Sequence, residues 1–236
     1  MKAVILAGGL GTRMGHETAS RPKPLVEVSG RPILWHILKS YQAHGIDDFI
    51  VCTGYAGHLI ARYMAIEREP DMRVEVIDTG EATATGGRLR RVRERLGDAP
   101  FCMTYGDGVS DVNIAELIAF HRRQQALVTV TAVQPRMPFG LVTFAGDGRQ
   151  VAAFQEKPQL DELWVNAGFF VVEPRALDYV EGDDDAWEGA PMTRLAHNGQ
   201  LAAFKHRGFW QCMDTPRDRD ALEQLWQDGG APWKVW

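Results

Sequence analysis

A glycine-rich segment and the cations that follow it carry the clearest chemical signal in this sequence. Residues 6–13 read LAGGLGTR, and residues 21–24 read RPKP. Glycines let the backbone come close to phosphate oxygens, and consecutive N–H groups can cradle them. Arg13 and Lys23 would place positive charge beside such a cradle. We interpret the segment as a phosphate-binding loop; the alternative is a tight turn with solvated basic side chains.

The loop does not match two common phosphate-binding motifs. Gly9 and Gly11 form a GxG pattern, but Met14 stands where the GxGxxG dinucleotide motif needs its third glycine. A P-loop is also excluded, because no Gly-Lys pair followed by Ser or Thr comes after the glycines. The sequence therefore predicts phosphate binding without a dinucleotide or P-loop signature.

Two aspartates stand out as candidate site residues. Asp107 lies in YGDGVSD, directly after an apolar segment, and Asp214 lies in MDT after an aromatic run. Mg²⁺ accepts one or two carboxylates together with substrate phosphates and water. Asp107 could equally be a turn residue, because a glycine on each side suits a turn. Asp214 needs a cation or hydrogen-bond donors, because an unpaired buried carboxylate is costly.

Alternating strand and helix signals predict the elements that must position these residues. Strands are expected at 2–7, 47–53, 73–77, 101–105, 127–133 and 168–172, and helices at 32–44, 56–66, 113–124, near 188–197 and at 218–227. This alternation is typical of an α/β fold with a mostly parallel, mixed, Rossmann-like sheet and helices on both faces. The loop after the first strand then lies at the carboxyl edge of the sheet, where ligands bind.

The second half of the chain is less regular. Residues 139–144 and 151–154 predict a hairpin around Gly146-Asp147-Gly148, which we interpret as a small β-rich insertion in one domain spanning 1–236. Residues 88–95 hold five arginines, and we interpret this run as a solvated helix face rather than a nucleic-acid contact.

Composition excludes several classes of protein. The 236 residues are 45 % hydrophobic and 24 % charged, which argues against long disorder, and the net charge of −5 argues against a nucleic-acid binder. Three widely separated cysteines exclude a zinc ribbon, argue against a disulfide scaffold and fit a reducing cytoplasm. No apolar run reaches the ~18 residues that span a membrane, and the first residues lack a signal-peptide pattern.

The chain resembles the sugar-1-phosphate nucleotidyltransferases along its whole length. GGLGTR and RPKP give the superfamily, and the match continues through DTGEATATGGRLRRV (78–92), TYGDGVSDV (104–112), EKP (156–158), WVNAGFFVVEP (164–174), GFWQCMDTPRD (208–218) and APWKVW (231–236). TGGR together with GFWQxMDT points to the glucose-1-phosphate cytidylyltransferase branch. The resemblance implies the nucleotide-diphospho-sugar transferase fold and the conversion of CTP and glucose 1-phosphate to CDP-glucose and pyrophosphate, with Mg²⁺ as cofactor.

The resemblance also implies roles for individual residues. The nucleotide would be held by Leu6, Ala7, Gly8, Gly9, Leu10, Gly11, Thr12, Arg13, Lys23, Thr83, Gly86, Gly87, Arg88 and Asp107. Asp107 and Asp214 would bind Mg²⁺, and Lys157, Asn166 and Gly168 would bind the sugar phosphate. Arg13, Lys23, Asp107 and Lys157 would be catalytic. Within this set we expect Gly86-Gly87 to bring backbone to the edge of the base, and Arg88 to donate to cytosine acceptors.

Other interpretations remain open at this point. The same chemistry could use UTP, dTTP or another sugar 1-phosphate, and a non-catalytic nucleotide-binding domain is a further alternative. The chain departs from the family in its short 67–72 segment, in QLDEL after EKP and in Met137-Pro138, where relatives carry an arginine. We expect a homo-oligomer without nucleic-acid or membrane partners.

Overall fold

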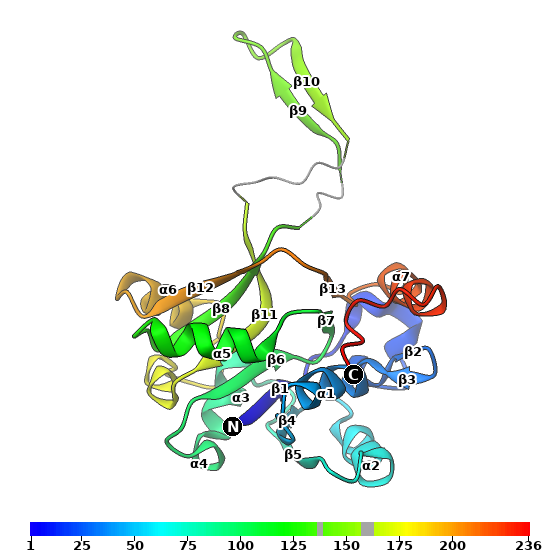
Figure 1. The fold of residues 1–236 in the computed structure, drawn as a ribbon, viewed down its shortest axis with the longest axis vertical. Coiled ribbons are helices and arrows are strands. Elements are labelled where there is room, and N and C mark those ends of the chain that lie inside the picture. Colours follow the sequence, from blue (N-terminus) through cyan, green and yellow to red (C-terminus); the bar gives the residue numbers. More distant parts are fainter. Residues whose placement is uncertain (136–138, 157–162) are drawn as a thin grey trace.

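The computed structural model describes residues 1–135, 139–156 and 163–236, and its centre is a seven-stranded sheet (Figure 1). In spatial order the strands are β12 (Leu201–His206), β8 (Val128–Val133), β11 (Val165–Val172), β6 (Phe101–Tyr105), β1 (Lys2–Leu6), β4 (Asp48–Thr53) and β5 (Arg73–Asp78). Neighbours pair in parallel except β11, which is antiparallel to both β6 and β8. The predicted mostly parallel, mixed sheet is therefore confirmed.

Helices cover both faces of this sheet, as predicted. One face packs against α1 (Ile33–Ala43), α2 (Gly57–Glu67), α5 (Ile114–Arg123) and α7 (Pro216–Gln227), and the other against α3 (Thr85–Arg91), α4 (Arg93–Leu96) and α6 (Ala190–His197). Side chains of β1 alternate between the two cores. Ala3 and Ile5 join the first core, while Val4 and Leu6 join the second.

Local sequence signals explain several element ends. Asn113 caps α5 by accepting the Glu116 N–H at 3.1 Å, and Gly45 ends α1 in the left-handed conformation at φ 77°. Thr215 and Asp218 form a capping box at the start of α7, with Pro216 in its first turn. The strands and helices predicted in the first half of the chain are present with shifts of one or two residues at their ends.

The sequence did not predict β12 or the short strands β7 (Gly108–Ser110), β13 (Trp210–Cys212), β2 (Glu27–Val28) and β3 (Arg31–Pro32). The 3₁₀ segments η1 (Thr12–Thr18), η2 (Lys23–Leu25) and η3 (Pro174–Tyr179) were also unforeseen. The short strands have too few residues to show a period of two, so only pairing with a distant partner reveals them.

The predicted hairpin is present as β9 (Leu141–Phe144) and β10 (Val151–Gln155), which pair antiparallel and project beyond the central sheet in Figure 1. Tryptophans of the C-terminal tail pack on the body instead: Trp233 is fully buried and its ring stacks on Phe209. Within the described residues, no helix is both long and apolar enough to cross a membrane.

Candidate active site

A cavity of about 620 Å³ lies at the carboxyl edge of β1 and β6. It is lined by Leu6, Ala7, Gly8, Gly9, Leu10, Gly11, Thr12, Arg13, Lys23, Pro24, Thr83, Ala84, Thr85, Arg88, Tyr105, Gly106, Asp107, Trp210, Cys212 and Asp214. A larger cavity of about 850 Å³ lies beside the start of α2, but neither Lys23 nor the two aspartates line it. The smaller cavity is therefore the candidate site, because the predicted loop, cations and carboxylates meet there.

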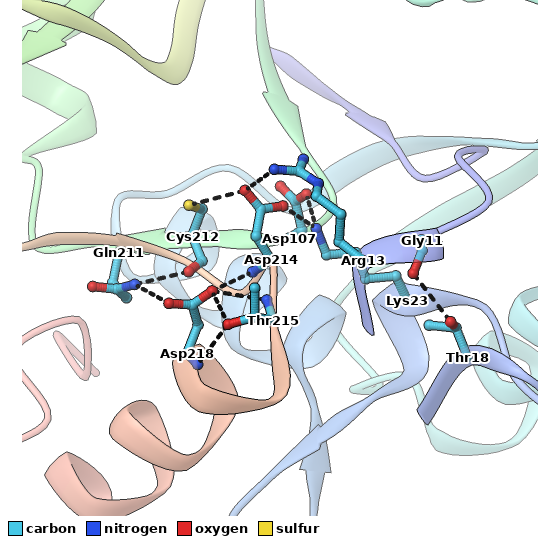
Figure 2. Close-up of polar contacts among 10 residues, drawn as sticks. All are labelled: Gly11, Arg13, Thr18, Lys23, Asp107, Gln211, Cys212, Asp214, Thr215 and Asp218. Atoms are coloured by element: carbon cyan, nitrogen blue, oxygen red, sulfur yellow. Dashed lines mark hydrogen bonds and ion pairs between the residues drawn. The ribbon is translucent and has the colours of Figure 1, made fainter. Parts of the chain in front are cut away.

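Lys23 joins the two predicted metal ligands. Its Nζ lies 2.7 Å from Oδ2 of Asp107 and 2.6 Å from Oδ1 of Asp214, while an Arg13 Nη lies 2.9 Å from the other oxygen of Asp214 (Figure 2). Lys23 is only 8 % exposed, whereas the Arg13 side chain is 71 % exposed. The site thus holds two carboxylates balanced by one buried and one solvent-facing cation.

These ion pairs set the protonation states of the site. Burial alone would lower the pKa of Lys23, but contact with Asp107 and Asp214 outweighs burial and raises it. Burial would raise the pKa of Asp214, but Lys23 and Arg13 hold it below its usual value. Burial and the Asp214 charge raise the pKa of the Cys212 thiol to about 12. At neutral pH the site therefore contains an ammonium, an ionised Asp214 and an unreactive thiol.

A pair of short strands brings the two aspartates together. β7 and β13 pair antiparallel, with Gly108 opposite Cys212, and the Met213 N–H donates to the Asp107 carbonyl at 2.8 Å. Asp107 directly precedes β7, and Asp214 is the second residue after β13. This pairing fixes the backbone on both sides of the carboxylate pair.

Asp218 holds the backbone that carries Asp214 (Figure 2). Its Oδ2 accepts the Asp214 N–H at 3.1 Å and the Thr215 N–H at 2.8 Å, and its Oδ1 accepts from Gln211 at 3.3 Å. The helix cap of α7 therefore also positions a site residue. Sequence reasoning missed this role, although Thr215-Pro216 followed by an acidic residue at 218 is the signature of such a cap.

Arg88 lies behind the glycine loop and binds its backbone. One Nη donates to the carbonyls of Thr53 and Gly80 and to Oγ1 of Thr79, each at 2.8 Å, and the other donates to the carbonyls of Gly8 and Glu81 at 3.1 and 3.3 Å. Burial lowers the pKa of Arg88, and the side chain is only 4 % exposed. The guanidinium thereby ties the loop after β1 to the loops after β4 and β5.

Comparisons with known proteins agree with this geometry. The family model described as "Nucleotidyl transferase" matches residues 2–235. The chain belongs to the nucleotidyl transferase family. It is 46 % identical over 258 aligned residues to the glucose-1-phosphate cytidylyltransferase of Salmonella typhimurium, and 37 % identical over 257 to a probable glucose-1-phosphate cytidylyltransferase of Bacillus subtilis, with 100 % of each chain covered in both cases.

The fold is shared with solved structures as well. The crystal structure of HddC from Yersinia pseudotuberculosis matches with a TM-score of 0.77 at 21 % identity, covering 95 % of this chain and 99 % of that one. The α/β architecture is therefore shared with HddC, while the family model and the curated relatives make the chain a nucleotidyltransferase.

The residues predicted to read the base lie differently with respect to the cavity of this nucleotidyl transferase, and their roles in base binding stay predictions. Gly86 and Gly87 do not line the cavity; their N–H groups donate to the Asp185 carbonyl at 2.9 and 3.3 Å. A Cβ on Gly87 would lie 2.5 Å from the Asp183 carbonyl oxygen, so glycine at this position lets the 183–185 loop pack closely. Arg88 lines the cavity, but both its Nη groups already serve protein acceptors, which makes it a positioning residue.

Of the predicted sugar-binding residues, Asn166 and Gly168 contact Tyr105, which lines the cavity, and do not line it themselves. Asn166 donates to the Tyr105 hydroxyl at 3.3 Å, and its Oδ1 accepts the Gly168 N–H at 2.7 Å. Gly168 has φ +80°, and a Cβ there would lie 2.4 Å from the Tyr105 ring, so glycine is required for the ring to pack. Lys157 lies outside the described residues. A sugar-binding role for all three residues stays a prediction.

Tyr105 is a cavity residue that the sequence did not reveal, and Glu188 holds it from outside the lining. Tyr105 lines the cavity and donates its hydroxyl to Glu188, which also accepts from Thr85 Oγ1 at 2.7 Å. Burial and the Glu188 charge raise the pKa of Tyr105, so it stays a neutral donor. No motif marks Glu188, because its partners lie 83 and 103 residues away in the chain.

The donor set fits a magnesium ion. Oxygens of Asp107 and Asp214 already converge on one cation, the Lys23 ammonium. Across the described ranges, no cluster of three or more potential protein ligands occurs. The remaining ligands would therefore come from phosphate oxygens and water, which is the coordination that Mg²⁺ usually adopts in such sites.

Proposed function

We propose that this nucleotidyltransferase transfers a cytidylyl group from CTP to glucose 1-phosphate, giving CDP-glucose and pyrophosphate. Identity over the full length to relatives named for this reaction supports both substrates. The observation that carries the proposal is the convergence of Lys23, Asp107 and Asp214 beside the glycine loop, because it provides a phosphate cradle and a cation site in one cavity.

The reaction needs no general base from the protein. A sugar 1-phosphate has a second pKa near ~6 and is largely dianionic at pH 7. One of its oxygens attacks the α-phosphorus of CTP, the bond from that phosphorus to the β-phosphate oxygen breaks, and pyrophosphate leaves with the bond electrons. Catalysis of such a transfer depends mainly on positioning and on stabilising charge. The cavity supplies both without a paired nucleophile and base.

Several residues of the chain share this work. N–H groups of residues 8–11 would hold the triphosphate, because the Ala7 N–H already donates to the Cys52 carbonyl at 2.8 Å, and Arg13 and Lys23 would stabilise charge on the departing pyrophosphate. Asn166 and Gly168 would position the sugar through Tyr105, and Lys157 would contact the sugar phosphate. Asp107 and Asp214 would hold Mg²⁺, which when bound polarises the phosphate oxygens that it contacts. Asp218 and Arg88 keep the carboxylate and the glycine loop in place.

The base would meet the segment that begins α3. Thr83, Ala84 and Thr85 line the cavity, whereas Gly86 and Gly87 are packed against the 183–185 loop. We therefore assign base recognition to residues 83–85 in place of the glycine pair.

A product assay tests the proposal. Purified enzyme with CTP, glucose 1-phosphate and MgCl₂ should form CDP-glucose and pyrophosphate in equal amounts. The same assay with galactose 1-phosphate and mannose 1-phosphate tests the sugar, and each should react more slowly. If a folded enzyme forms no CDP-glucose even at high concentration, the proposal is contradicted.

We also propose that the chain forms a homo-oligomer through the β9–β10 hairpin. Phe144, Val151 and Phe154 on this hairpin are 59 %, 57 % and 63 % exposed. An isolated two-stranded hairpin is marginally stable in water, and exposed apolar clusters mark interaction surfaces. Light scattering should give a mass above one chain for the wild type and a lower mass for Phe144→Ser/Phe154→Ser. A monomeric wild type would contradict this assembly.

We further propose that the enzyme is located in the cytoplasm. Cys52, Cys102 and Cys212 are free thiols, which suits a reducing compartment. Fractionation of cells should recover the activity with cytoplasmic marker enzymes.

A further inference from the structure

We propose that Lys23 is a built-in counter-cation of the metal site: its ammonium lies between the two carboxylates where the divalent cation would bind, and it must withdraw before the metal can enter. This inference rests on the proposed function, because it concerns the metal of the same site. It assigns Lys23 a task before the reaction, in addition to its contact with the leaving pyrophosphate.

The distances place the ammonium at the shared point of the two carboxylates. Nζ lies 2.7 Å from Asp107 Oδ2 and 2.6 Å from Asp214 Oδ1. Mg²⁺ binds carboxylate oxygens at about 2.0–2.1 Å, so an ion held by the same two oxygens would lie very close to Nζ. An ammonium and a divalent cation repel each other strongly at such a separation, especially where little water screens them. The two cations therefore exclude one another.

The lysine side chain can make way while the backbones that carry the three residues stay in place. The backbone around Lys23 is fixed by prolines on both sides and by hydrogen bonds from Leu25 N–H to the Pro22 carbonyl at 2.9 Å and from Val26 N–H to the Lys23 carbonyl at 3.0 Å. The backbones of the aspartates are tied by the Met213 N–H bond to the Asp107 carbonyl at 2.8 Å. A flexible four-carbon stem carries the ammonium, so it can move while the carboxylates stay.

The cavity offers the displaced ammonium a new position beside the glycine loop. Lys23 and the glycine loop line the same space, so a triphosphate on the loop would offer its oxygens to Nζ. A metal that enters alone must displace the ammonium into water, whereas a metal that enters with a nucleotide gives it a new anionic partner. Arg13 does not block the shared point, because it contacts the other oxygen of Asp214 and is 71 % exposed. Lys23 thus makes metal affinity depend on the nucleotide.

Binding of Mn²⁺ alone, without nucleotide or sugar, tests this inference. Electron paramagnetic resonance measures free Mn²⁺, and the Kd of Lys23→Met should be at least about tenfold lower than that of the wild type. Lys39→Met makes the same change of charge at a lysine whose ammonium bonds Gln42 on α1, and it should keep the wild-type Kd. Adding Asp107→Asn to Lys23→Met should remove the gain, because the tight site needs that carboxylate.

The outcomes separate this inference from the proposed function. Equal or weaker Mn²⁺ binding in Lys23→Met, or tight binding that survives Asp107→Asn, would overturn it. If a melting curve shows that Lys23→Met does not fold, Lys23→Gln, which keeps a hydrogen-bond donor, takes its place with the same expectation. The Mn²⁺ titration uses neither a nucleotide nor a sugar phosphate. Its result would therefore stand if the CDP-glucose assay failed, and the CDP-glucose assay would stand if the titration failed.

Discussion

A Cβ atom on Gly8 would lie 2.1 Å from Nη1 of Arg88, so the buried position of this guanidinium requires glycine at residue 8. Glycines on two loops approach the guanidinium closely, because a Cβ atom on Gly54 would also lie 2.8 Å from Nη1 of Arg88. This close approach explains why a charged side chain can lie buried behind a phosphate-binding loop: each of its Nη groups has backbone acceptors within reach.

Gly8→Ala should therefore destabilise the protein and damage nucleotide binding together. The methyl group displaces the guanidinium and leaves buried carbonyls unpaired, which we expect to lower the free energy of unfolding by about 2–4 kcal/mol. Urea unfolding gives that value, and kcat/KM for CTP should fall in the same variant. Gly9→Ala is the matched control for stability, because a Cβ there meets nothing within 4 Å.

Arg88→Lys should have a similar effect, since one ammonium cannot serve acceptors on three loops. Arg90→Lys, at an exposed position on the same helix, should stay within about 0.5 kcal/mol of the wild type. The double variant Gly8→Ala/Arg88→Lys should lose less than the sum of the single changes. Additive losses would contradict the pairing.

Asp107→Asn and Asp214→Asn should each abolish Mg²⁺-dependent turnover while the fold is kept. The amide removes the negative charge that the cation needs, and we expect kcat to fall by at least about 10²-fold at saturating Mg²⁺. Pyrophosphate release measures the rate, and circular dichroism checks the fold. Asp220→Asn, an exposed change on α7, should keep the wild-type rate. Near wild-type kcat in either site variant would show that its carboxylate is not a metal ligand.

Arg13→Ala should separate catalysis from stability. Its ion pair with Asp214 is solvent-exposed, so its loss should change the free energy of unfolding by at most about 1 kcal/mol. Its charge should act mainly as pyrophosphate departs, so kcat should fall by about 10²-fold or more with little change in KM for CTP.

Arg21→Ala provides the control for Arg13→Ala, because Arg21 pairs with Glu17 and Glu27 and does not line the cavity. It should keep the wild-type kcat. A raised KM with unchanged kcat in Arg13→Ala would make that residue a binding group alone.

The fold and half of the site could be predicted from local patterns. Strand 2–7 followed by glycines, and strand 101–105 followed by Asp107, place both segments at one edge because parallel strands end together. Contacts between distant segments could not be predicted. β7 and β13 have three residues each, and nothing in the sequence pairs them. The arginine run looked like a solvated helix face, and only the glycines on other loops make a buried place for Arg88.

Buried histidines should make the fold sensitive to mild acid. His36 is fully buried; its Nε2 lies 2.9 Å from the Val28 carbonyl, and Trp233 donates to its Nδ1 at 3.4 Å. Burial lowers the pKa of His36 from its ordinary 6.5 despite the bond to Val28. Below pH 6.5 the unfolded chain therefore protonates this histidine more readily than the folded state does. The free energy of unfolding keeps its full value above pH 6.5 and falls below it, by up to about 1.4 kcal/mol per pH unit.

Urea unfolding at pH 7.5 and pH 5.5 measures this effect. His36→Gln should be less stable than the wild type at pH 7.5 but should lose less stability on acidification. His58→Gln, at an exposed histidine on α2, should follow the wild type. An unchanged loss in His36→Gln would show that another group controls the acid response.

The choice of nucleotide tests the central claim most directly. Cytosine presents an amino donor at C4 where uracil presents a carbonyl, and a mismatched polar group costs about 1–3 kcal/mol. Initial rates of pyrophosphate release at fixed glucose 1-phosphate, with CTP or UTP varied, give kcat/KM for each nucleotide. We predict a preference for CTP of at least about tenfold. Equal kcat/KM for UTP and CTP would contradict the cytidylyl assignment and leave only the family-level activity.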